Sequence, residues 1–82
     1  MSEWKSKLVL RDGETTKHIA SKTKGFVGET DIDTYDIVDS HGQRNGTVTV
    51  EVHTAVRGFK KTISVEQRDM TGAIIVDETW NP

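Results

Sequence analysis

The stretch TVTVEVHTAV, residues 47–56, alternates apolar and polar side chains and decides the fold class. Val48, Val50 and Val52 share one parity, and the residues between them are polar. Because successive side chains of a strand project to opposite faces, this spacing predicts a strand with one buried and one hydrated face.

The residues after this stretch predict that it continues into an antiparallel meander. A two-residue turn at 57–58 and a four-residue turn at 69–72 would connect three strands, with Trp80 closing one end of the core. All apolar partners then fall on one face, as a correct register requires. The predicted cross-strand pairs are Val50 with Val65, Val52 with Ile63, Gln67 with Ile74, and Val65 with Val76.

The first half of the chain predicts further strands. The apolar residues of segment 4–10 share a face, and Asp12-Gly13 is a strong hairpin signal. Residues 15–24 fit either a strand or a short helix, and their β-branched side chains favour a strand. The apolar residues of 32–38 change parity, so we expect a bulge or a twist near Asp36.

These elements predict one all-β domain of five or six antiparallel strands, as a curled sheet or a small barrel. The 82 residues are 33% apolar, which implies a thin core. Cysteine is absent from the sequence, so disulfides and thiolate metal sites are excluded. The start of the chain lacks the apolar run of a signal peptide, and no stretch is long enough to span a bilayer. We therefore expect a cytoplasmic protein without a membrane partner.

Residue patterns for catalysis or metal binding are weak. The histidines at 18, 41 and 53 lack the spacing that places two imidazoles on one face. The acidic run that begins at Asp31 lacks the glycine and the final carboxylate of a calcium loop. Ser40 and His41 are neighbours, and adjacent side chains in an extended chain point apart. We predict no enzymatic activity, catalytic residue, metal or cofactor.

The remaining hypothesis is a protein-interaction module, which binds another protein or forms a homodimer. A thin core, a strand face open to solvent and unpaired sheet edges would all be relieved by association. The predicted contact residues lie on that face: Thr49, Glu51, His53, Thr62 and Ile75.

The alternative hypothesis is a small barrel that binds single-stranded nucleic acid. Basic residues next to Phe59 favour it, because phosphates attract cations and bases stack on aromatic rings. The acidic sequence pI of 5.9 argues against it. The residues of this alternative patch are Arg44, Arg57, Lys60 and Lys61.

Overall fold

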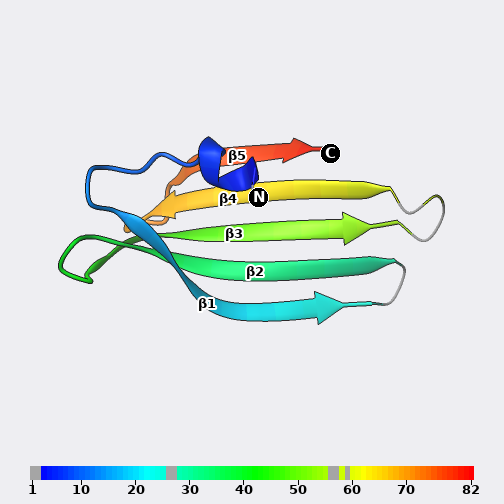
Figure 1. Ribbon diagram of the computed structural model, residues 1–82, viewed down its shortest axis with the longest axis horizontal. Helices are drawn as coiled ribbons and strands as arrows, with labels where there is room; N and C mark the ends of the chain where they lie inside the picture. Colours follow the sequence, from blue (N-terminus) through cyan, green and yellow to red (C-terminus); the bar gives the residue numbers. More distant parts are fainter. Residues whose placement is uncertain (1–2, 26–27, 56–57, 59) are drawn as a thin grey trace.

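The computed structural model describes residues 3–25, 28–55, 58 and 60–82, and these form one five-stranded antiparallel sheet (Figure 1). The elements are the 3-10 helix η1 (Glu3–Lys7) and the strands β1 (Thr15–Lys24), β2 (Glu29–Val38), β3 (Arg44–Thr54), β4 (Lys61–Asp69) and β5 (Ile74–Trp80). Strand order follows chain order, and the sheet stays open with β1 and β5 at its edges. The predicted all-β class is confirmed, and residues 15–24 form a strand. Among the described residues, no helix is long and apolar enough to cross a membrane.

The register between β3 and β4 is the predicted one. Val50 pairs with Val65, and Val52 pairs with Ile63. Arg57 of the predicted turn at 57–58 lies outside the described residues, although the pairing that the turn would set is present.

The predicted register between β4 and β5 is wrong by two residues. Gln67 pairs with Val76 instead of Ile74, and Val65 pairs with Glu78. Two features add one residue each: the turn extends through Ala73, so that Arg68 pairs with Ile74, and a β-bulge makes Ile75 an additional residue beside Arg68. A shift of two positions preserves the facing of each side chain, so Val76 still points into the core.

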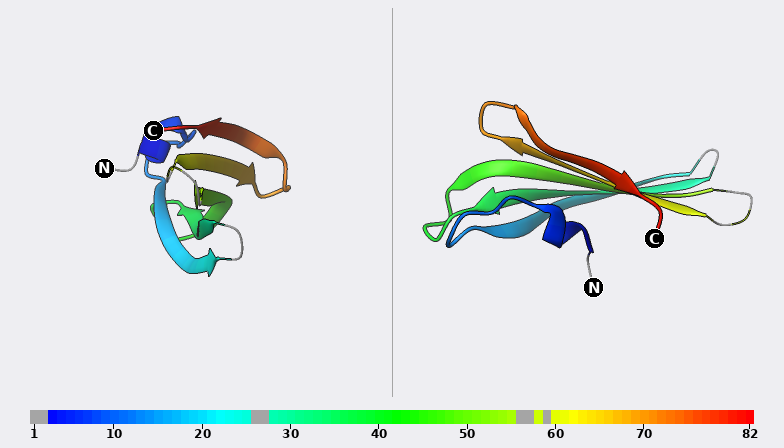
Figure 2. Two further views of the ribbon diagram at one scale, coloured as in Figure 1. Left: turned by 90° about the vertical axis from the view of Figure 1, so that its right-hand side faces the viewer. Right: turned by 90° about the horizontal axis from the view of Figure 1, so that it is seen from above.

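One face of the sheet, which we call the core face, carries the hydrophobic core. Figure 2 shows that the sheet is curled and that the chain before β1 lies on its concave side. The buried core residues are Trp4, Ile37, Val48, Val50, Val65 and Val76, with Leu8, Tyr35, Ile63 and Trp80 packed against them. The opposite face, which we call the open face, has no covering layer in the described part of the chain.

The predicted first strand within 4–10 is wrong. Residues 3–7 form η1, and both Trp4 within it and Leu8 just after it pack into the core. Leu10 remains 41% exposed. The turn at Asp12-Gly13 is present, with the Glu14 N–H donating to the Arg11 carbonyl over 3.0 Å, but it joins this segment to β1 and does not close a hairpin.

Two further bulges lie beside β2, where the sequence changes parity. Ile19 is an additional residue in β1, next to the pair His18 and Tyr35. Asn45 is an additional residue in β3, next to Ile37. The expected irregularity near Asp36 is thus supplied by the two neighbouring strands, while β2 itself places Tyr35 and Ile37 on the core face.

Two hairpin turns, residues 39–43 and 69–73, are built alike. Each turn begins with an aspartate, Asp39 or Asp69, whose N–H donates to the carbonyl of the residue four positions later. The Oδ1 atom of the same aspartate accepts hydrogen bonds from backbone N–H groups of the turn. Backbone hydrogen bonds from Gln43 and His41 lower the pKa of Asp39. The Thr71 hydroxyl, followed by backbone N–H groups, lowers the pKa of Asp69.

Candidate functional site

Four of the five predicted contact residues lie on the open face. Thr49 and Glu51 line a shallow hollow of about 210 Å³ over β3, β4 and β5. His53 pairs with Thr62 across β3 and β4, and its Nδ1 lies 2.8 Å from the Thr30 hydroxyl oxygen. These four therefore share a surface, as the alternation of the strands predicts.

The open face is polar and acidic over its β4–β5 half. Glu66 lies directly opposite Asp77, and both line the same shallow hollow as Glu51. Arg68 donates to Glu66 over 2.6 Å, which compensates one of these carboxylates. Hydroxyl and carboxylate groups of this kind keep a surface hydrated, so this hollow lacks the apolar centre that a stable protein interface requires.

Ile75, the fifth predicted contact residue, lies elsewhere. Its bulge places it in a hollow of about 500 Å³ near the β4–β5 turn, together with Val9, Met70 and Ile37. We call this the apolar hollow. Polar side chains complete its lining, namely Arg11, Glu14, Asn45, Gln67, Arg68, Asp69 and Thr71.

Exposed apolar residues gather around the apolar hollow. Val9, Met70 and Ile75 are 58%, 57% and 46% exposed. Leu10 and Ile74, their neighbours in the chain, are also exposed large hydrophobic residues. A concentration of such side chains at one place on a small domain marks a candidate contact surface.

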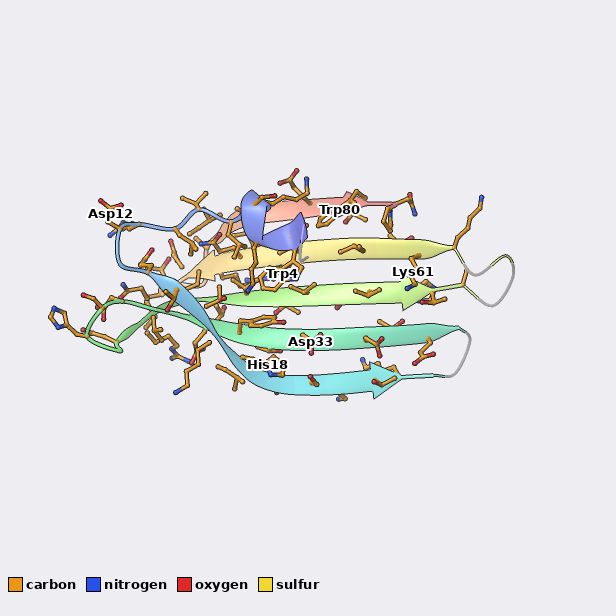
Figure 3. All side chains as sticks on the ribbon, viewed as in Figure 1. Trp4, Asp12, His18, Asp33, Lys61 and Trp80 are labelled. Carbon is orange, nitrogen blue, oxygen red and sulfur yellow. The ribbon has the colours of Figure 1, made fainter. Side chains whose placement is uncertain are left out.

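The residues of the nucleic-acid alternative are divided between the two ends of the sheet. Arg44 starts β3 and lies 4.0 Å from Asp36, whereas Lys61 pairs with Thr54 at the other end of β3. Lys61 lies toward the end of the sheet opposite Asp12 (Figure 3). Lys60 and Lys61 line a hollow of about 570 Å³ with Asn81 and Pro82, while Arg57 is outside the described residues.

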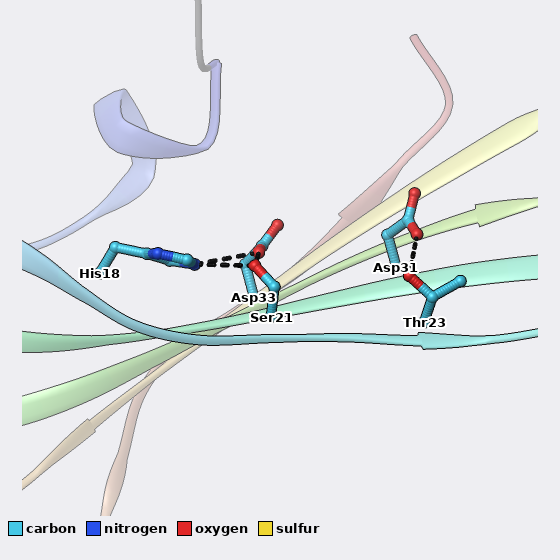
Figure 4. Close-up of polar contacts among 5 residues, drawn as sticks. All are labelled: His18, Ser21, Thr23, Asp31 and Asp33. Atoms are coloured by element: carbon cyan, nitrogen blue, oxygen red, sulfur yellow. Dashed lines mark hydrogen bonds and ion pairs between the residues drawn. The ribbon is translucent and has the colours of Figure 1, made fainter.

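A polar cluster on the core face was not predicted from the sequence. His18 Nε2 lies 3.1 Å from Asp33 Oδ1 and 3.0 Å from the Ser21 hydroxyl oxygen (Figure 4). Residues 18 and 21 are three apart and would face opposite ways in a regular strand, but the bulge at Ile19 brings them to one side. The hydrogen bond from Ser21, and then the interactions with His18, lower the pKa of Asp33.

This cluster lacks the geometry of a nucleophilic triad. A triad needs the serine on one ring nitrogen and the carboxylate on the other, so that the base can take the serine proton. Here Ser21 and Asp33 share the same nitrogen of His18, and Ser21 donates its proton to Asp33. The cluster therefore ties β1 to β2 and does not activate Ser21.

Neither a search for metal-binding groups nor comparisons with known proteins give a further assignment. Within residues 3–25, 28–55, 58 and 60–82, no group of three histidine, aspartate or glutamate side chains could hold a metal ion. Comparisons of the chain with protein families, with curated proteins and with solved structures find no match.

Proposed function

We propose that this domain is a non-enzymatic protein-interaction module that works in the cytoplasm and binds its partner through the apolar hollow. The observation that supports the proposal is the gathering of Val9, Met70 and Ile75 around one concavity, each about half exposed. The partner is another protein or a second copy of the chain, and in either case it supplies an apolar side chain.

The size and the rim of the apolar hollow define the chemistry of the partner. A concavity of about 500 Å³ accommodates one or two large apolar side chains. Full burial of each such side chain contributes roughly 1.5–3 kcal/mol. Arg11 and Arg68 on the rim are balanced by Glu14 and Asp69, so flanking charges of both signs suit the site.

Selection from a displayed peptide library on the immobilised full chain tests the proposal. We expect enriched peptides to carry an apolar anchor and to lose at least tenfold in affinity for Ile75→Ser, measured by fluorescence polarisation. Ile19→Ser is the matched control, because Ile19 also lies at a bulge of an edge strand and is 52% exposed. Absence of enriched peptides, or equal loss with both variants, would refute the assignment.

A second candidate function is single-stranded nucleic-acid binding at the hollow beside Lys60 and Lys61. The two lysines and the Asn81 amide support it, because cations attract phosphates and amides bond to bases. Titration of the full chain with a labelled single-stranded oligonucleotide at low and high salt tests it. Binding that weakens steeply with salt would favour this function, and no binding at low salt would exclude it.

A further inference from the structure

The segment before β1 covers the core face without joining the sheet. We call residues 3–10 the N-terminal segment. Trp4 is 9% exposed, and its ring centroid lies 4.7 Å from that of Tyr35. Lys7 lies over the Trp80 ring at 4.6 Å from the centroid and 3.8 Å from Glu78. These contacts are made by side chains, since the described part of this segment contains no strand.

One buried side chain holds the backbone of the N-terminal segment. Gln67, which is 2% exposed, accepts a hydrogen bond from the Val9 N–H at 2.9 Å and donates to the Val9 carbonyl at 2.8 Å. The amide thus takes the place of a neighbouring strand at one residue. Any chain that presents the same segment could make the same contacts.

A short exposed turn connects this segment to β1. Gly13 has a φ of +81°, a left-handed conformation that residues with a side chain rarely adopt. On the β1 side, Glu14 is held to the sheet by the Asn45 amide at 2.9 Å. The pivot between the segment and the sheet is therefore Asp12-Gly13.

We propose that the core face also accepts the N-terminal segment of a second copy, so that two chains exchange these segments and form a dimer. This inference rests on the self-associating form of the proposed function and assigns it to a different surface. Exchange re-forms every contact of Trp4, Lys7 and Val9 in the partner. The balance between monomer and dimer is then set by the cost of association and by how well residue 13 adopts the left-handed turn.

Straining the turn tests the inference. We expect Gly13→Val, which disfavours the left-handed turn, to raise the dimerisation constant roughly tenfold or more, because two turns are relieved in each dimer. Sedimentation equilibrium measures it. Gly42→Val is the matched control, since Gly42 has a φ of +80° but lies in the β2–β3 turn. Equal association of the two variants would overturn the inference.

Cross-linking shows directly which chain supplies the segment. Carbodiimide couples lysine to carboxylate, and Lys7 lies close to Glu78. Isotope-labelled and unlabelled Gly13→Val chains are mixed in denaturant, refolded together and cross-linked. We expect the dimer to contain Lys7–Glu78 links between labelled and unlabelled chains. Wild-type chains refolded together at high concentration provide the same measurement if the variant does not fold.

The outcomes separate this inference from the proposed function. A dimer whose Lys7–Glu78 links join only residues of one chain, and which Ile75→Ser abolishes, overturns segment exchange and supports the apolar hollow as the interface. Absence of a dimer from every preparation also overturns exchange, while the peptide selection still decides the proposed function. Mixed-isotope links in a dimer that Ile75→Ser leaves intact support exchange.

Discussion

Replacement of Gln67 by leucine isolates the contribution of the amide that holds the N-terminal segment. The two hydrogen bonds to Val9 measure 2.9 and 2.8 Å, and each is worth roughly 0.5–1.5 kcal/mol of net stability. Val9 is 58% exposed, so water can reach the groups that lose their partner and reduce the penalty. We therefore expect Gln67→Leu to lower the free energy of unfolding by about 2 kcal/mol.

Urea unfolding followed by tryptophan fluorescence measures this loss, and thermal unfolding should show a decrease in Tm of roughly 10 °C for a domain of this size. The matched control is Gln43→Leu in an exposed turn, where we expect a change within about 0.5 kcal/mol. If both variants were equally stable, the amide would not hold the segment and the reasoning would fail.

A second variant at position 67, Gln67→Glu, should gain stability relative to the wild type as the pH falls. In Gln67→Glu the carboxylate cannot donate to the Val9 carbonyl, so the folded state favours the protonated acid and its pKa rises. A raised pKa on an acid means that stability is lost at neutral pH and regained as the pH falls. Relative to wild type, the variant should therefore recover stability on acidification in urea titrations, and a constant difference would contradict the assignment.

Three further predictions concern the core, the N-terminal segment and the hairpin turns. Val48→Ala should cost about 2–3 kcal/mol in urea unfolding, because Val48 is 0% exposed, while Val9→Ala should stay within about 0.5 kcal/mol; equal losses would contradict the assigned core. Trp4→Ala should cost about 3–5 kcal/mol by the same assay, and a loss below about 1 kcal/mol would show that the tryptophan does not cover the core. The lowered pKa values of Asp39 and Asp69 mean that their stabilisation is complete above the ordinary value of 3.8 and is lost as the pH falls below it. Circular dichroism on acidification should show this loss, and Asp69→Asn should make it less steep; an unchanged profile would exclude that carboxylate.

The centre of the sheet was predictable because one physical rule governs it. The valines of β3 share a parity, and only one register places them opposite apolar residues of β4. The same parity placed Gln67 on the core face. Its partner could not be found, since a hydrogen bond to Val9 across 58 positions leaves no local pattern.

The remaining features were missed because bulges and short helices leave ambiguous patterns. A spacing of four residues between Trp4 and Leu8 fits both a strand and a helical turn. The additional residue at Ile19 reverses facing, and so brings His18 and Ser21 together against the expected alternation. Ile75 was predicted to be a contact residue on the hydrated face, and its bulge explains why it lies in the apolar hollow instead.

The bulges in β1 and β5 have a consequence for the behaviour of concentrated protein. An open sheet presents two rows of unsatisfied peptide groups, which can template amyloid growth. At Ile19 on one side and at Ile75 on the other, the even spacing of these groups is broken. The edge strand β1 carries lysines at 17, 22 and 24, and the edge strand β5 carries carboxylates at 77 and 78. These charges oppose the pairing of an incoming strand with either edge. Fibrillation that starts from the folded state should therefore be slow, and seeding should require prior unfolding of an outer strand.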